Sequence, residues 1–275
     1  MKMKKSLLFT LVTLFVIVLS SITLYYDATH TALTRLKVEK ITLKDAKIPQ
    51  SLDGIKIVYF SDLHLFANEN DDFISSVFDQ IQKQDADILL FGGDFIDASI
   101  QILSEDQLTF IHDNLSKLNP DLGFFAVVGQ DDAANLETLK SIYHTHNIEI
   151  LENKAVTLRN NSHIGIQLFG YQGLESSLES LNTSLHTISF MYDPNWLSDL
   201  RSSNIDVVFS AKTHGGQVDL PLFEPSYSRA RGEYISGEYS LNQTKMMISN
   251  GISTSETQAR LFRDPSIYVI TLKQK

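Results

Sequence analysis

The amino-acid sequence predicts an α/β domain that follows one N-terminal membrane-spanning helix. Two observations lead to this prediction. An apolar stretch without charged residues, glycine or proline runs from Leu7 to Tyr25. From Ile55 onward, short β-branched or aromatic runs alternate with segments of helical periodicity. Such alternation is typical of an α/β domain whose strands are buried at its centre.

The N-terminal stretch has the length of a membrane span. About 20 apolar residues in a helix cross the hydrocarbon core of a bilayer, and Tyr25 and Tyr26 stand where an interfacial aromatic anchor would lie. We therefore expect residues 1–26 to be a retained anchor that binds the lipid bilayer. A cleavable signal peptide is the alternative, because its first residues would be equally basic. The apolar run is long for a signal peptide, and no Ala-x-Ala site follows it.

The short basic N-terminus and the absence of cysteine favour a single-pass protein whose domain lies outside the cytoplasm. Basic residues also follow the span, so the charge bias alone does not fix the orientation. Residues 27–54 are expected to form a stalk and one edge strand. Residues 55–275 are expected to form the domain.

The individual elements are predicted from their periodicity. Strands are expected at residues 55–60, 88–91, 124–128, 164–169 and 207–209, and helices at 72–84, 105–118 and 135–146. Two later strand-like runs, at 245–249 and 267–272, indicate a mixed sheet.

Composition excludes several kinds of function. The formal net charge of -10 excludes a nucleic-acid binder, which needs a basic surface for phosphate contacts. It does not exclude a phosphate-containing substrate, because a buried metal ion dominates the field around it. The chain has no cysteine, which excludes disulfides, thiolate zinc sites and a cysteine nucleophile.

Three loops at the ends of predicted strands carry residues that can bind a metal ion. The segment VYFSDLHLF places Asp62 and His64 two positions apart, LLFGGDFID places Asp94 after two glycines, and SAKTHGG contributes His214. Chemistry in α/β sheets collects at the carboxyl ends of strands. Two carboxylates and two imidazoles form a mixed oxygen and nitrogen site that suits manganese, iron or zinc.

Together these loops resemble the signature of the calcineurin-like metallophosphoesterases, in particular the bacterial membrane-associated phosphodiesterase branch with its His-x-His-Gly-Gly-Gln loop. The resemblance implies a two-sheet α/β/β/α sandwich with two metal ions bridged by an aspartate. It also implies that Asp62, His64, Asp94 and His214 form the first metal site, with Asp94 as the bridge.

The sequence departs from the family pattern at the second metal site. Gln130, Tyr192 and Lys212 stand where the family has an asparagine and two histidines, and Asp131 stands in place of the catalytic histidine. We therefore expect one divalent transition metal and a poorly formed second site, with Asp131 and Lys212 as the candidate catalytic groups. The Lys212 ammonium is expected to replace the second metal beside Asp94 or Asp131. A lysine that points to solvent is the alternative.

Two functions are consistent with these features. The first is an anchored hydrolase of phosphate monoesters or diesters, lipid-linked or from the cell envelope, with weak or mononuclear activity. The second is an inactive relative that binds a phosphorylated ligand or a protein partner at the membrane.

Overall fold

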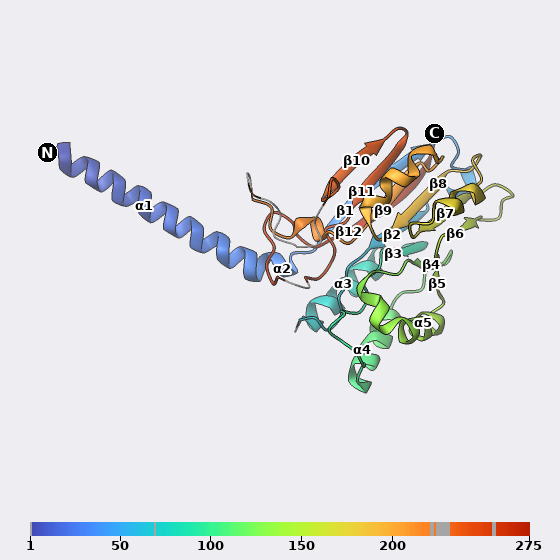
Figure 1. The fold of residues 1–275 in the computed structure, drawn as a ribbon, viewed down its shortest axis with the longest axis horizontal. Coiled ribbons are helices and arrows are strands. Elements are labelled where there is room, and N and C mark those ends of the chain that lie inside the picture. The colour runs from blue at the N-terminus through green and yellow to red at the C-terminus, as the bar shows by residue number, and fades with distance from the viewer. Residues whose placement is uncertain (1, 69, 221–222, 224–231, 255–256) are drawn as a thin grey trace.

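The computed structural model describes residues 2–68, 70–220, 223, 232–254 and 257–275. Its first element, α1 (Lys2–Tyr26), continues through a π-helical turn (Asp27–Thr31) into α2 (Ala32–Thr34). The continuous helix is long and apolar enough to cross a membrane. It extends away from the rest of the chain (Figure 1) with its apolar side chains exposed, as expected for a segment that lipid would surround.

The first sheet has six strands. Their order is β1 (Lys37–Asp45), β12 (Ser266–Gln274), β2 (Lys56–Phe60), β3 (Ile88–Phe91), β4 (Phe124–Ala126) and β5 (Ile148–Ile150). Strands β2 to β5 are parallel neighbours, and β12 runs antiparallel to β2. Three helices connect the parallel strands: α3 (Asp71–Lys83), α4 (Glu105–Leu115) and α5 (Leu136–Thr145).

The second sheet also has six strands. Their order is β10 (Gly237–Leu241), β11 (Thr244–Ile248), β9 (Val207–Ser210), β8 (Thr187–Met191), β7 (Ile166–Tyr171) and β6 (Lys154–Leu158). The four central strands are parallel, and each edge strand pairs antiparallel with its neighbour. Most of β7, β8 and β9 is buried on both faces, which explains their continuous apolar or small-residue sequences.

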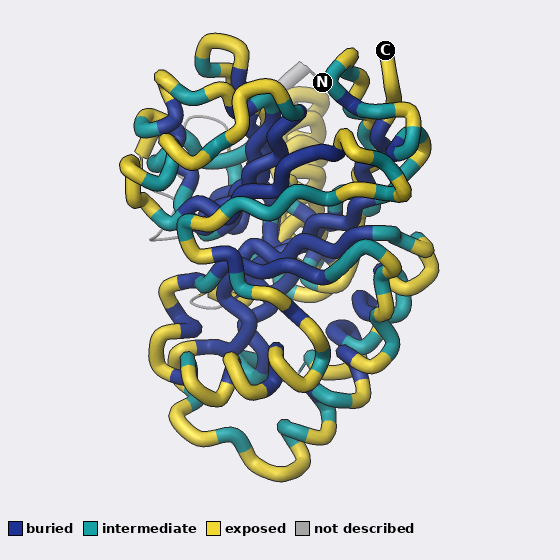
Figure 2. Tube along the Cα trace, turned by 90° about the vertical axis from the view of Figure 1, so that its right-hand side faces the viewer, coloured by how far each residue is buried: buried dark blue, intermediate teal, exposed yellow. Residues whose placement is uncertain are grey.

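The two sheets pack face to face, and buried strands form the centre of the molecule (Figure 2). Alternate residues of β2 point to opposite faces, so Tyr59 packs between the sheets while Phe60 packs against the helices. The outer face of the second sheet is covered by a 3₁₀ segment, Pro194–Ser202, that contributes Leu197 and Leu200. The predicted two-sheet sandwich is confirmed, with a 3₁₀ segment in its fourth layer.

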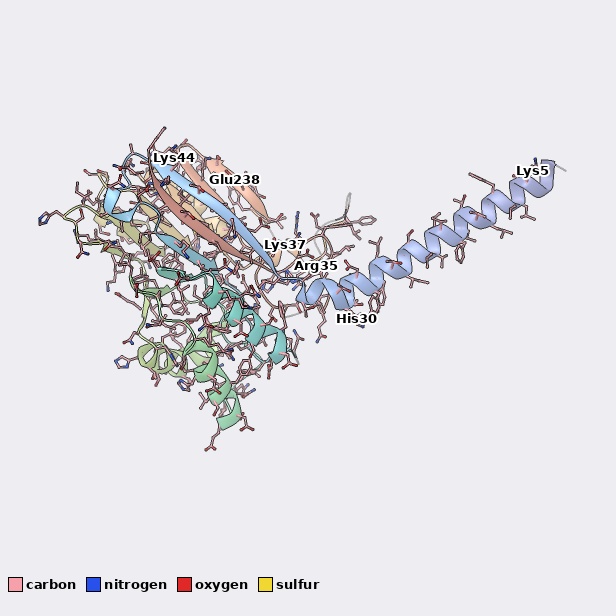
Figure 3. The ribbon with its side chains drawn as sticks, turned by 180° about the vertical axis from the view of Figure 1, so that it is seen from behind. Lys5, His30, Arg35, Lys37, Lys44 and Glu238 are labelled. Carbon is pink, nitrogen blue, oxygen red and sulfur yellow. The ribbon has the colours of Figure 1, made fainter. Side chains whose placement is uncertain are left out.

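The end of the N-terminal apolar helix is fixed to the domain (Figures 1 and 3). The Arg260 backbone N–H donates to the Ala28 carbonyl at 2.8 Å, and Ala28 is buried. Arg35 forms ion pairs with Asp27 at 3.0 Å and with Asp264 at 2.9 Å. Strand β1 then pairs along its whole length with β12. The helix therefore leaves the domain at a defined place.

Candidate metal centre

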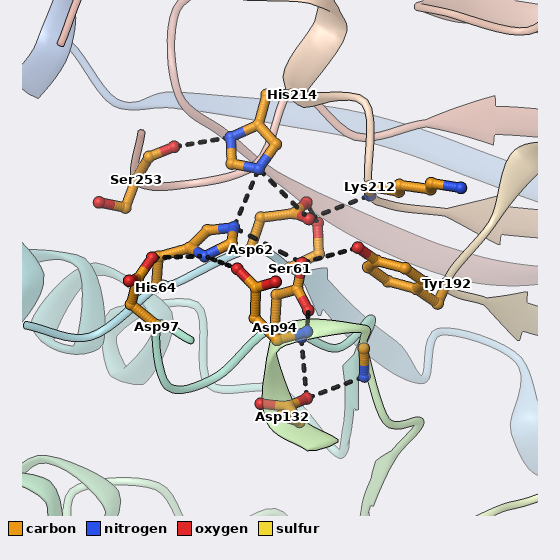
Figure 4. A network of polar contacts seen from close by, with 12 residues as sticks. Ser61, Asp62, His64, Asp94, Asp97, Asp132, Tyr192, Lys212, His214 and Ser253 are labelled. Atoms are coloured by element: carbon orange, nitrogen blue, oxygen red, sulfur yellow. Dashed lines mark hydrogen bonds and ion pairs between the residues drawn. The ribbon is translucent and has the colours of Figure 1, made fainter. Parts of the chain in front are cut away.

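The four predicted metal ligands converge at the carboxyl ends of β2, β3 and β9 (Figure 4). The Nε2 atoms of His64 and His214 lie 3.0 Å apart. His214 Nε2 lies 3.7 Å from Asp62 Oδ1, and His64 Nε2 lies 3.6 Å from Asp94 Oδ2. Ligand atoms that each lie about 2.0–2.2 Å from one ion are separated by roughly 3–4 Å. The ligand atoms of Asp62, His64 and His214 thus have the spacing of a single metal site, and Asp94 lies beside His64.

Each of these four residues has a left-handed backbone. Their φ angles are 54° at Asp62, 39° at His64, 55° at Asp94 and 50° at His214. Residues other than glycine adopt this region at a cost of about 1–3 kcal/mol, and such residues concentrate at functional sites. The strand ends therefore turn sharply to bring all four side chains together.

Two glycines allow the loops to approach each other closely. A Cβ atom on Gly129 would lie 2.1 Å from Asp94 Oδ1. A Cβ atom on Gly251 would lie 2.9 Å from the Asp62 Cβ, and Gly251 also has a φ of +67°. A side chain at either position would displace a carboxylate of the cluster.

The hydrogen bonds of the imidazoles fix which ring nitrogens face each other. His214 Nδ1 lies 2.9 Å from the Ser253 carbonyl oxygen, which can only accept, so Nδ1 carries the proton. His64 Nδ1 lies 3.2 Å from Asp131 Oδ2 and 3.3 Å from Asp97 Oδ2, although neither contact has the angle of a well-formed hydrogen bond. If both rings are neutral and His64 also carries its proton on Nδ1, facing the two carboxylates, two Nε2 lone pairs face each other at 3.0 Å. A shared metal ion or a proton between them removes this repulsion, so the residues present fit a metal ion.

The ionisation of the cluster reflects its burial. Burial raises the pKa of Asp62 to about 7, and the neighbouring charge of Asp94 adds to this effect. Burial likewise raises the pKa of Asp94 to about 6. Burial alone would lower the pKa of His64, but its contacts with Asp131 and Asp97 and the nearby carboxylates raise it to about 10. Without a metal ion the cluster therefore retains a proton at His64, and a bound dication would displace that proton.

Further side chains hold the ligands in place. Ser61 Oγ donates to Asp62 Oδ2 at 2.6 Å, and Asp97 and Asp131 face His64. Asp132 accepts hydrogen bonds from the backbone N–H groups of Asp94 at 2.9 Å and Gly129 at 2.8 Å. Sequence reasoning missed Ser61, Asp97, Asp132 and Ser253. Asp97 stands three residues after Asp94 and Asp132 directly follows Asp131, but nothing in the sequence marks the Ser253 carbonyl.

The substituted second-site positions have different surroundings. The Tyr192 hydroxyl donates to Asp94 Oδ2 at 2.8 Å and is buried with its ring. The Lys212 ammonium pairs with Asp193 and lies 5.9 Å from the centre of the Tyr192 ring, so it does not pair with Asp94 or Asp131 as expected. Asp193 directly follows Tyr192 and offers Lys212 a nearer, partly exposed carboxylate. Gln130 is exposed to solvent.

The fold and this strand-end cluster define a metallophosphoesterase. A family model described as calcineurin-like phosphoesterase matches residues 55–245, and the chain belongs to this family. Members of the family use divalent metal ions.

Several curated proteins are similar to the chain. The metallophosphoesterase YkuE of Bacillus subtilis, described as uncharacterized, is 28% identical over 242 residues, with 84% of each chain covered. A metallophosphoesterase of Aquifex aeolicus, described in the same way, is 28% identical over 255 residues, covering 87% of this chain and 93% of the relative. UDP-2,3-diacylglucosamine pyrophosphatase LpxG of Chlamydia muridarum is 26% identical over 253 residues, covering 72% and 75%.

Proposed function

We propose that the protein is a membrane-anchored phosphoesterase with one tightly held divalent metal ion. The observation that carries this proposal is the pair of buried imidazole Nε2 atoms, 3.0 Å apart, with a carboxylate oxygen beside each. Four donor atoms in this arrangement match one ion of manganese, iron or zinc.

The residues of the cluster have separate tasks in this proposal. One divalent ion held by Asp62, His64, Asp94 and His214 would act as a Lewis acid toward a phosphoryl group. Asp131 and Asp97 keep the Nδ1 proton on His64 and so orient its Nε2 toward the ion. Asp131 therefore acts mainly as a positioning residue, whereas Lys212 pairs with Asp193 and has no task at the metal centre in this proposal.

The expected activity is slow. The Tyr192 hydroxyl already donates to Asp94 Oδ2, which would make this carboxylate a poorer ligand for a second ion. A histidine near the leaving group is also absent, and a general acid of that kind is worth about 10²–10⁴-fold in rate. One bound metal ion would still polarise a phosphoryl group, so we expect turnover to be reduced but retained.

The proposed substrate is a phosphoester or pyrophosphate of a membrane or cell-envelope lipid. The N-terminal helix would confine the site to the bilayer surface, with the domain outside the cytoplasm. The similarity to a pyrophosphatase named for a diacylated nucleotide sugar supports a lipid-linked substrate.

The second candidate function is binding of a phosphorylated ligand without turnover. The hydrogen bond between Tyr192 and Asp94 and the ion pair between Lys212 and Asp193 favour it, because both stabilise a second site without a metal ion.

Hydrolysis of bis(p-nitrophenyl) phosphate by the full chain in detergent separates these candidates. We expect slow, metal-dependent hydrolysis that Asp94→Asn and His214→Ala abolish, while Ser184→Ala, an exposed position before β8, leaves the rate unchanged. Metal binding without any hydrolysis would support the binding protein. Failure to bind a metal ion would contradict both.

A further inference from the structure

A large cavity lies between the end of the N-terminal helix and the loops of the metal centre. It has a volume of about 1010 Å³ and is bounded on one side by Thr29, Leu33 and Thr34 of the helix end. Its other walls come from residues 66–68, the start of α3, and Ser253, Thr254 and Gln258. Ligand pockets in proteins span about 300–1,000 Å³, so its size suits a large ligand.

This cavity adjoins two of the metal-ligand loops. The backbone N–H of Ala67, in its wall, donates to the His64 carbonyl at 3.1 Å. Ser253, also in its wall, provides the carbonyl oxygen that faces His214 Nδ1. Asn68 Nδ2 donates to the Thr254 carbonyl at 2.7 Å and so holds the two loops together. The cavity therefore adjoins the backbone that positions His64 and His214, while the four ligand side chains themselves do not line it.

The length of the helix indicates where the cavity would lie relative to the bilayer. A charge-free segment from Ser6 to Tyr26 is about 30 Å long at about 1.5 Å per residue, the thickness of the hydrocarbon core. Ala28, which Arg260 contacts, lies about 3 Å beyond that segment. Thr29 to Thr34 then follow within about 12 Å, which covers the headgroup layer and its outer edge.

An exposed aromatic side chain, Phe262, lies close to the point where the domain contacts the helix end. Phe262 follows Arg260 by two residues and is 58% exposed. An exposed phenylalanine is unfavourable in water but favourable at the boundary between headgroups and acyl chains. Its position indicates that this face of the domain, beside the helix end, rests on the bilayer.

The lining of the cavity determines the chemistry of its ligand. Leu33, Phe66 and Phe73 supply apolar surface, and the lining also holds amides, hydroxyls and the imidazole of His30. At the rim, Asp71 and Asp72 are exposed and would repel a free phosphate anion. Apolar surface combined with neutral polar groups fits the glycerol ester region of a lipid, where acyl chains and carbonyl groups occur together.

We propose that this cavity receives the lipid portion of a membrane phosphoester, which enters from the bilayer and brings its phosphate to the metal centre. The inference rests on the proposed function, because it identifies the substrate class of the same site. The proposed ligand is a membrane lipid and not a soluble phosphate.

The test uses the full chain in phospholipid vesicles that contain a phosphatidylglycerol with a photoactivatable diazirine on its acyl chain. After illumination, labelled peptides are mapped by mass spectrometry. We expect labelling of the cavity segments 66–73 and 253–258 in addition to the membrane helix. The double variant Thr34→Trp/Gln258→Trp, which fills the cavity, should reduce cavity labelling about fivefold and leave labelling of the helix unchanged.

The matched control is Thr31→Trp/Thr257→Trp. Both residues are exposed neighbours of the substituted pair and do not line the cavity, so labelling should equal that of the unmodified chain. Equal cavity labelling in both double variants, or no cavity labelling in the unmodified chain, would overturn the inference. Hydrolysis of bis(p-nitrophenyl) phosphate without cavity labelling would support the proposed function and contradict the lipid site. Cavity labelling without any metal-dependent hydrolysis would support the lipid site and contradict the enzyme.

Discussion

At the scale of single residues, the protonation of the metal ligands decides how strongly the centre holds an ion. Carboxyl groups bind a metal ion only when they are deprotonated, so protons compete with the metal. Burial raises the pKa of Asp62 to about 7 and of Asp94 to about 6, which extends this competition to neutral pH.

Metal affinity should therefore fall as the pH decreases. Both raised pKa values are those of acids, so the two carboxyl groups are in their metal-binding form above pH about 7 and lose it as the pH falls through about 7 and then 6. We expect zinc to bind the full chain at least about tenfold more weakly at pH 5.5 than at pH 8, measured by calorimetry. Binding should also release protons at pH 8, because His64 has a pKa of about 10. Constant affinity across this range would contradict the ligand set.

Tyr192 is the residue that distinguishes this centre from a two-metal site. Its hydroxyl donates to Asp94 Oδ2, and Lys212 lies beside its ring. The four substitutions Gln130→Asn, Asp131→His, Tyr192→His and Lys212→His made together should raise the metal content toward two ions per chain and increase the hydrolysis rate. Lys212→His alone should change neither, because the groups of such a site act as a unit. A full gain from the single variant would show that Tyr192 does not block the second site.

At the scale of secondary-structure elements, the turns after the strands create the centre. Gly129→Ala should lower metal affinity by about tenfold or more, because its Cβ would lie 2.1 Å from Asp94 Oδ1. Gly237→Ala is the control. Its Cβ would meet nothing within 4 Å, while its φ of +85° makes alanine cost about 1 kcal/mol of folding stability. Metal titration and thermal unfolding of both variants separate the two effects; equal metal affinity in the two variants would rule out the steric role of Gly129.

Elements with a strong local pattern were predictable from the sequence, whereas their long-range partners were not. The strand at 88–91 agrees with the structure, and the predicted helices at 72–84 and 135–146 differ from it by about one residue at each end. The helix predicted to end at 118 ends at Leu115, since residues after it turn toward β4. The parallel pairing of β1 with β12 joins segments more than 200 residues apart, and no local pattern encodes that register.

The same distinction applies to the metal centre. The ligand types and their positions after strands were sufficient to predict that Asp62, His64, Asp94 and His214 converge. The partner of Lys212 was not predictable, because Asp193 becomes its neighbour only through the packing of the loops after β8 and β9. Side-chain pairing between loops depends on tertiary geometry that residue spacing does not contain.

At the scale of the whole molecule, Arg260 connects the membrane helix with the metal centre. Its side chain is fully buried. Its backbone contacts Ala28, and its Nη2 donates at 2.7 Å to the Ser253 carbonyl, which also faces His214 Nδ1. Arg260 therefore contributes both to the attachment of the helix end and to the orientation of His214.

Arg260→Lys should consequently weaken metal binding by about tenfold, because a lysine cannot reproduce the several donor directions of a guanidinium. Arg159→Lys, at an exposed position, serves as the control and should bind metal like the unmodified chain. Circular dichroism of both variants checks that the fold is retained. Unchanged metal affinity in folded Arg260→Lys would show that the contact between Arg260 and the helix end does not influence the metal centre.

The central claim is that four residues hold one metal ion, and metal stoichiometry tests it most directly. The full chain, purified in detergent and dialysed free of excess metal, is analysed by inductively coupled plasma mass spectrometry beside His214→Ala. We predict about one transition-metal ion per chain in the unmodified protein and almost none in the variant. Two tightly bound ions per chain, or an unchanged metal content in His214→Ala, would contradict the account.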